Sequence, residues 1–336
     1  MVVNTNNFLI MAFGESSFRR ILLSRLLCLS VPFLIFGIYV TYRKARSAFL
    51  DTARQNLTES SVRKGESINQ AIEAIRGNLA TASSIANLKT KSKANHQLFV
   101  QQLHHALPMG VECVQIQDVR TQEITGGTCR SQLTNLSEND FPLTQSFKEN
   151  LTPLEEVKVK FISPVESNQN SVRLYPKNSL NLLFYAPIYN AQGYLQYKLL
   201  VQLTLIKNEK VEPGSLDGYS VVINEDGVIL AHPIAQRIGK NIRDMPDATR
   251  LESILRNAVE GKENFLHLFS FEKNDVELVA GYTAIPSPIT GEEGKKWVIL
   301  AVSRLDLALL PLKTIQHLLT SLAFVLIIVN ILAILY

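Results

Sequence analysis

The sequence lacks the motifs that mark most enzyme active sites and metal centres. It contains no G-x-G-x-x-G or G-x-S-x-G motif, and its six histidines include no H-E-x-x-H pair. The three cysteines form no paired C-x-x-C motif, and the adjacent His104 and His105 cannot both face one ion from a helix. Gly291–Lys296 lacks the spacing and the Ser or Thr of a P-loop, so it is predicted to be a turn. We therefore expect no catalytic site, no cofactor and no metal.

A strong excess of either charge is also absent. The 34 basic and 30 acidic residues give a net charge of +4, and they are dispersed along the chain. A balance this mild does not indicate a nucleic-acid partner.

Cysteine is scarce. Cys28 lies in an apolar run and is predicted to be a small buried hydrophobe. Cys113 and Cys129 flank a predicted strand–turn–strand that has Gly126-Gly127 near its far end. A disulfide between them would suit an oxidising compartment, and two free buried thiols are the alternative. The sequence leaves both open.

Long uncharged runs lie near both ends of the chain. Residues 26–42 carry no charge and, with the apolar residues before them, give about 20 residues, enough to cross a bilayer. Basic residues, beginning with Arg43, follow where a cleaved signal peptide would have small residues. Residues 314–336 contain no Asp, Glu, Lys or Arg. We predict transmembrane helices over 21–42 and 312–336.

A long helix is predicted after the first span, over residues 43–90. It has an apolar seam spaced alternately four and three residues apart, formed by Ile68, Ile72, Ile75, Leu79, Ala82 and Ala86. This seam predicts either a helix packed on its own domain or a stalk that pairs with a second copy to form a homodimer. Both can hold along different parts of the helix.

Two groups of strands follow the long helix. The first, within residues 91–206, comprises a helix over Asn95–Leu107, a loop over 131–153, and strands near 111–119, 157–162, 181–188 and 196–205. A boundary is predicted over 207–216, which contains Glu-Pro-Gly. The second group, within 207–311, comprises a helix over Ala248–Glu260 and strands near 220–223, 228–231, 264–271, 276–284 and 297–302.

The second group opens with the most telling stretch, Tyr219–Asn241. Two β-rich runs flank Asp226-Gly227, a pair that can take the positive φ angles of a tight hairpin. His232-Pro233 ends the second run, because proline has no N–H to donate to a sheet. We expect His232 to have a turn and packing role.

These residues carry a family resemblance. A strand, an Asp-Gly turn, a strand closing on Ala-His-Pro and then Ile-Gly-Lys-Asn resembles the membrane-proximal half of a double-Cache sensor domain. Gly281–Pro286 and Lys296–Val302 resemble the last two strands of that family. Cache domains are PAS-like folds found outside the membrane in bacterial chemoreceptors, sensor kinases and cyclic-nucleotide enzymes. The resemblance implies an α+β fold: a long N-terminal helix and two PAS-like antiparallel-sheet subdomains, flanked by two transmembrane helices.

The resemblance also implies a ligand site in the first, membrane-distal subdomain (91–206). Polar residues there that could clamp a carboxylate are Arg130, Arg173, Tyr175 and Tyr185; each could instead be an ordinary surface or packing residue. The amino-acid-binding subset of the family carries an R-x-W-Y type cluster. This chain departs from it, because its single tryptophan, Trp297, lies in the second subdomain. An amino-acid ligand is therefore not predicted.

The predicted function is ligand sensing at the inner (plasma) membrane. Residues 1–20 are expected in the cytoplasm and 43–311 outside it, on the resemblance and on cysteine usage. A small molecule would bind the distal subdomain, and the second span would carry the change inward. Because the chain ends at Tyr336 without a kinase, a cyclase or a chemoreceptor hairpin, we expect a separate or missing cytoplasmic output domain. The alternatives are an anchored structural or protein-interaction module and an anchored extracytoplasmic enzyme.

Overall fold

The structure is a computed structural model that describes residues 6–85, 92–129, 133, 154, 156–162, 179–207, 218–262, 264–268 and 277–335. The chain divides into two compact units. Unit 1 comprises residues 1–53 and 305–336, and unit 2 comprises residues 54–304. Each unit is described by itself.

Unit 1 is helical. It contains the first part of helix α1 (Asn6–Ile85), the short α4 (Leu305–Ala308) and α5 (Leu310–Leu335). Within the described residues one helix is long and apolar enough to cross a membrane, over Leu310–Val329 in α5. The predicted span over 21–42 forms part of α1, where large apolar side chains such as Phe33 and Phe36 are exposed. The two-span arrangement stays a prediction.

The first sheet of unit 2 follows α1 and α2 (Lys93–Ala106) in the chain. Its strands, all antiparallel, are β1 (Val111–Asp118), β2 (Ile124–Gly127), β3 (Lys158–Phe161), β4 (Ser179–Tyr189) and β5 (Leu195–Lys207). Their order across the sheet is β2-β1-β5-β4-β3. The pairing of β4 with β5 confirms the predicted hairpin, whose turn is closed by the Asn190 side chain.

The second sheet has the same design. Its strands are β6 (Tyr219–Ile223), β7 (Ile229–Ala231), β8 (Asn264–Leu268), β9 (Leu278–Pro286) and β10 (Lys296–Arg304), in the order β7-β6-β10-β9-β8. Two 3₁₀ turns, η2 (Ala235–Arg237) and η3 (Ile242–Asp244), and helix α3 (Ala248–Val259) lie between β7 and β8 in the chain. Apolar residues of α3 pack on one face of this sheet, so the helix is amphipathic.

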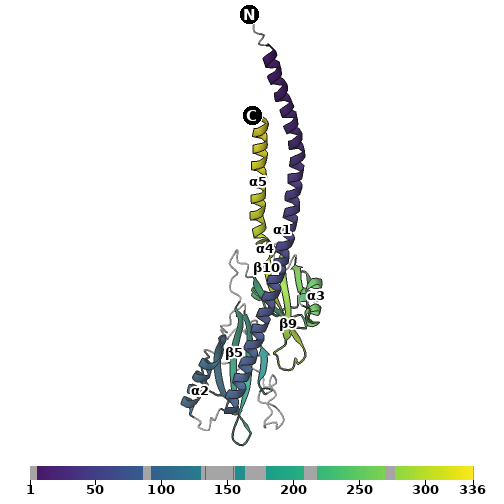
Figure 1. The fold of residues 1–336 in the computed structure, drawn as a ribbon. Helices are drawn as coiled ribbons and strands as arrows, with labels where there is room; N and C mark the ends of the chain where they lie inside the picture. The colour runs from purple at the N-terminus through teal and green to yellow at the C-terminus, as the bar shows by residue number, and fades with distance from the viewer. Residues whose placement is uncertain are drawn as a thin grey trace. The chain divides into compact units, whose positions relative to one another are not determined.

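Helix α1 runs along both sheets of unit 2 (Figure 1). Four seam residues, Ile68, Ile72, Ile75 and Leu79, share one hydrophobic core with apolar side chains from both sheets, and none is more than 4% exposed. Packing on its own domain is therefore confirmed for these four residues. Ala86, the last residue of the predicted seam, lies outside the described residues.

The approach of α1 to the second sheet is close enough to require small residues. A Cβ added to Gly65 would lie 3.0 Å from Ile285 and 3.1 Å from Thr283, both on β9. A Cβ added to Gly281 would overlap the α1 backbone at Leu57 and Thr58. Two glycines thus let the helix and the strand approach at backbone distance.

The predicted helix over 43–90 lies largely inside α1, which begins earlier than predicted and ends at Ile85. The predicted strands and the helices over 95–107 and 248–260 are confirmed to within a few residues. The predicted loop over 131–153, except Leu133, and the boundary over 208–216 lie outside the described residues.

Candidate functional site

The two faces of the first sheet differ in chemistry. Apolar residues of β1, β4 and β5, among them Val114, Phe184 and Val201, face the core shared with α1 and α2. On the opposite face the strand register aligns Cys113 with Gln202, Gln202 with Leu183, Gln115 with Leu200 and Leu200 with Tyr185. Directly paired residues of antiparallel strands share a face. We call this surface, which carries Gln115, Gln117 and Gln202, the glutamine face.

The glutamine face is buried although much of it is polar. Gln115 is 1% exposed, and the three glutamines are all buried. Cys113, Leu183, Tyr185 and Leu200 form a separate small core there with Leu133. Buried amides normally have hydrogen-bond partners, since leaving one unpaired costs about 1–3 kcal/mol. The partners of these amides therefore show what this face is built to hold.

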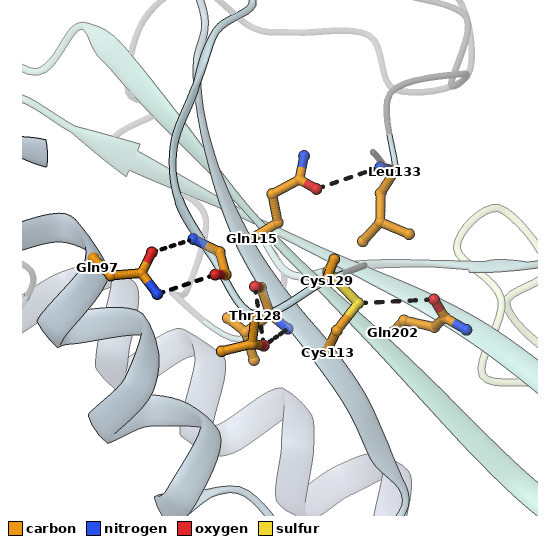
Figure 2. Close-up of a disulfide and its surroundings, with 9 residues drawn as sticks. Gln97, Cys113, Gln115, Thr128, Cys129, Leu133 and Gln202 are labelled. Atoms are coloured by element: carbon orange, nitrogen blue, oxygen red, sulfur yellow. Dashed lines mark hydrogen bonds between the residues drawn. A yellow bond between two sulfur atoms is a disulfide. The ribbon is translucent and has the colours of Figure 1, made fainter. Parts of the chain in front are cut away.

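Only the oxygen of the Gln115 side-chain amide is hydrogen-bonded among the described residues. Its Oε1 accepts a hydrogen bond from the backbone N–H of Leu133 at 3.3 Å. Because a backbone N–H can only donate, this bond fixes which end of the amide is oxygen. Its Nε2 is buried and has no hydrogen-bond partner among the described residues. Figure 2 shows this nitrogen pointing away from the disulfide.

The disulfide between Cys113 and Cys129 lies on the same face (Figure 2). The backbone N–H of Thr128 donates to Val114 O at 2.8 Å, and the N–H of Val114 donates to Thr128 Oγ1 at 3.0 Å. This pairing continues β2 alongside β1 and brings Cys129 over Cys113, with the two Cα atoms 4.8 Å apart. The bridge ties Cys129, just after the end of β2, to β1 on the glutamine face.

The adjacent edge of the sheet is closed by α2. Gln97 Nε2 donates to Gly127 O at 3.1 Å, and Gly127 N–H donates to Gln97 Oε1 at 2.9 Å, so the side-chain amide pairs with β2 as a neighbouring strand would. A Cβ on Gly126 would meet the α2 backbone at His96, which explains the small residue there. These contacts hold β2, and with it Cys129, in place.

Gln117 and Gln202, the other two glutamines of this face, contact neighbouring residues through their side-chain amides. Gln117 Nε2 lies 3.0 Å from both the backbone and the side-chain oxygen of Gln122. Gln202 Oε1 lies 3.9 Å from the Cys113 sulfur. Among the three glutamines, Gln115 is the one with a fully buried side-chain nitrogen that has no hydrogen-bond partner among the described residues.

Tyr185 is the described residue of the predicted ligand set, and it lies on this face, 5% exposed. Its pKa is raised, first by burial and then by the nearby Tyr189 and Glu156. Burial likewise raises the pKa of Glu156, an effect that Lys158 opposes. Tyr185 is therefore a neutral phenol at physiological pH, able to donate or accept a hydrogen bond.

The other three predicted ligand residues, Arg130, Arg173 and Tyr175, lie outside the described residues. Sequence reasoning missed Gln115 and Gln202. Gln115 alternates with the apolar Val114 and Ile116, a pattern typical of a strand with one face in solvent. The recurrence of glutamine on two predicted strands, at 115 and 117 and at 202, was the sequence signal that could have indicated this polar face.

His232 fulfils the predicted turn role in the second sheet. It is fully buried, and its Nδ1 accepts the backbone N–H of Ile234 at 2.9 Å. Burial, together with Arg237, lowers the pKa of His232 to about 3. The imidazole is therefore neutral at physiological pH and stabilises the turn after β7.

The glutamine face has the chemistry of a binding site. It offers a buried amide donor and a neutral phenol within an apolar surround, a combination typical of small-molecule sites. Within the described ranges no three His, Cys, Asp or Glu side chains gather as a metal site would require.

Solved structures of other proteins share the fold of this chain, whereas no sequence comparison finds a match. No protein-family model and no curated protein sequence matches the chain. The periplasmic sensory domain of the Campylobacter jejuni chemoreceptor Tlp1 matches with 12% identity and a TM-score of 0.51, covering 77% of this chain and 98% of that domain. A domain of a sensory box/GGDEF family protein from Vibrio parahaemolyticus matches with 12% identity and a TM-score of 0.50, covering 77% and 99%. The chain has the fold of such sensory domains, and the resemblance to double-Cache domains is confirmed at that level.

Proposed function

We propose that this protein is a membrane-anchored sensor whose glutamine face binds a small molecule outside the cytoplasm. The observation that carries the proposal is the buried, half-satisfied amide of Gln115, on the same sheet face as Tyr185 two strands away, where the core shared with α1 and α2 does not extend. A stable fold rarely keeps an amide donor buried without a partner. A ligand that accepts a hydrogen bond would supply one.

The ligand class follows from the donors. Gln115 Nε2 donates, and the Tyr185 hydroxyl can donate, so a ligand carboxylate or carbonyl oxygen would suit both. Arg130 directly follows the bridged Cys129 in the chain, and with Arg173 and Tyr175 it stays a candidate for clamping a carboxylate. An oxygen-rich, hydrogen-bond-accepting metabolite is the proposed class.

The proposed membrane arrangement has two spans, residues 21–42 and 312–336, with 43–311 outside the inner membrane. The apolar length of α5 and the exposed apolar side chains of α1 between Leu29 and Tyr39 support it. The first sheet would form the distal subdomain (91–206), and the second sheet the proximal one (207–311).

Transmission would follow from a shift between two arrangements of unit 2, which the ligand biases by its different affinity for each. The second span would carry the change towards the cytoplasm. A homodimer would form through the part of α1 before Ile68, because the seam from Ile68 to Leu79 is already buried within its own unit.

A melting screen of the full chain in lipid nanodiscs tests the binding proposal. Carboxylates, purines, polyamines and amino acids would each be added at high concentration. A compound at one hundred times its dissociation constant adds about 2.7 kcal/mol, a shift of several degrees. Stabilisation by any one of them is the expected result. If none shifts the melting temperature, and a protein partner captured by the intact chain does, the protein-interaction alternative replaces the sensor.

A further inference from the structure

The loop that joins β9 to β10, residues Ser287–Lys295, reaches the first sheet. Its Thr290 pairs with Val159 of β3: the Thr290 N–H donates to Val159 O at 3.1 Å, and the Val159 N–H donates to Thr290 Oγ1 at 2.8 Å. Both backbone groups of Val159 that face away from β4 are thereby used. Val159 is 1% exposed, so these groups have no access to solvent.

The loop is held in one shape by its own hydrogen bonds. Ser287 N–H donates to Lys295 O at 2.9 Å across its base, and Ser287 Oγ donates to Glu292 Oε2 at 2.6 Å. Gly291 has a φ of +89°, a value that favours glycine, and lies directly after Thr290. A loop so constrained presents Thr290 in a fixed position.

Further contacts attach the loop to α1 and to the β6–β7 turn. Arg76 of α1 donates to Pro288 O at 3.2 Å. At the base of the loop, Lys295 pairs with Asp226 of the β6–β7 turn at 3.1 Å, and the Lys296 N–H donates to Glu225 Oε2 at 2.8 Å. The loop therefore links α1 and β3 to the hairpin and the last strand of the second sheet.

This link connects the glutamine face to the end of the chain that leads to α5. In β3, Lys158 pairs directly with Tyr185 and Val159 pairs with Phe184, so β3 lies beside the proposed ligand position. From the loop, β10 runs to Arg304, and α4 begins at the next residue. A displacement of β3 would reach the C-terminal helix through a single strand.

We propose that Thr290 is a positioning residue that couples the first sheet to β10 through its paired hydrogen bonds with Val159. The coupling rests on the proposed sensing function for its biological meaning, because it would carry the ligand's effect from Tyr185 towards α5. It is a property of the protein with or without a ligand. It can therefore be measured in the unliganded full chain.

Hydrogen exchange of the full chain in nanodiscs tests the coupling. Thr290→Val removes the hydroxyl at nearly constant volume and keeps the backbone N–H, whereas Thr290→Ser keeps the hydroxyl. Exchange of the Val159 amide should be about tenfold faster in Thr290→Val, since a buried donor loses its acceptor. Thr290→Ser should exchange like the wild type.

A second perturbation distinguishes coupling from local support. Val302 is fully buried at the end of β10 far from the loop. It packs in a core formed by strands of the second sheet with η3 and α3. Val302→Ala should speed exchange of the β3 amides by about threefold or more in the wild type and in Thr290→Ser, but not in Thr290→Val. No effect of Val302→Ala on β3, or an equal effect in all three backgrounds, would overturn the proposal. Because the experiment uses no ligand, its failure and the failure of the ligand screen are separate results.

Discussion

Removal of the Cys113–Cys129 disulfide should destabilise unit 2 by an amount that the loop length sets. The two cysteines are 16 residues apart, and a bridge closing a loop of about this size stabilises by about 3 kcal/mol through the entropy of the unfolded chain. For a unit of about 250 residues, each kcal/mol lowers the melting temperature by about 2–4 °C. The expected decrease is therefore about 6–12 °C.

The assay is thermal unfolding of the full chain in detergent, with and without the reductant TCEP, followed by circular dichroism. The variant Cys113→Ala/Cys129→Ala should melt at the same temperature as the reduced wild type. Cys28→Ala is the matched control: it removes the third cysteine and should respond to TCEP as the wild type does. A decrease below about 2 °C on reduction would refute the chain-entropy reasoning for this loop. A response that disappears in Cys28→Ala would show that a different cysteine is responsible.

Two further predictions concern the second sheet. Gly281→Ala should destabilise unit 2 by about 3 kcal/mol in urea unfolding, because the new Cβ overlaps the α1 backbone at Leu57 and Thr58. The control variant Gly77→Ala has open space around its Cβ and should be neutral or stabilising. Equal stability of the two variants would contradict the close packing of α1 on β9. His232 should make stability fall with acid: its pKa of about 3 in the folded state lies below the unfolded value of 6.5, so the unfolded state binds more protons between these pH values. Stability should then decrease by up to about 1.4 kcal/mol for each pH unit lowered from 6.5 towards 3, and His232→Gln should flatten this part of the profile. An unchanged slope in that variant would assign the pH dependence to other groups.

The strand pattern and the turn chemistry were predictable from local residues. Asp226-Gly227 predicted the hairpin, and Gly227 does adopt a φ of +85° with Asn224 closing the turn. The apolar spacing of Ile68 to Leu79 predicted a buried helix face, which the structure places in a core shared by both sheets. Such features depend on neighbours close in sequence, so the sequence alone specifies them.

The candidate site was predictable only in part, because it depends on strand register. Tyr185 was selected for its chemistry and its place in the first group of strands. Gln115 lies two strands away on the same face and 70 positions earlier in the chain, with Leu200 of β5 between the two residues. The alternation in β1 is typical of a strand with one face in solvent, and it does not show that the second face is also covered.

The link between Thr290 and Val159 was not predictable for a related reason. The sequence predicted Gly291–Lys296 to be a turn, and the turn is confirmed. Its partner lies 131 residues away on the edge of another sheet, and a single backbone pair leaves no periodic pattern in the sequence.

The most direct test of the central claim is the affinity of the full chain for the compound that stabilises it most, measured by calorimetry on three glutamine and tyrosine variants. Gln115→Met and Tyr185→Phe remove the two polar groups at nearly constant shape, and Gln101→Met makes the same exchange at an exposed position of α2. Binding on the glutamine face predicts at least about tenfold weaker affinity for Gln115→Met, because a buried hydrogen bond to the ligand is lost, and unchanged affinity for Gln101→Met. Equal affinity of Gln115→Met, Tyr185→Phe and the wild type would contradict the account and place the ligand elsewhere.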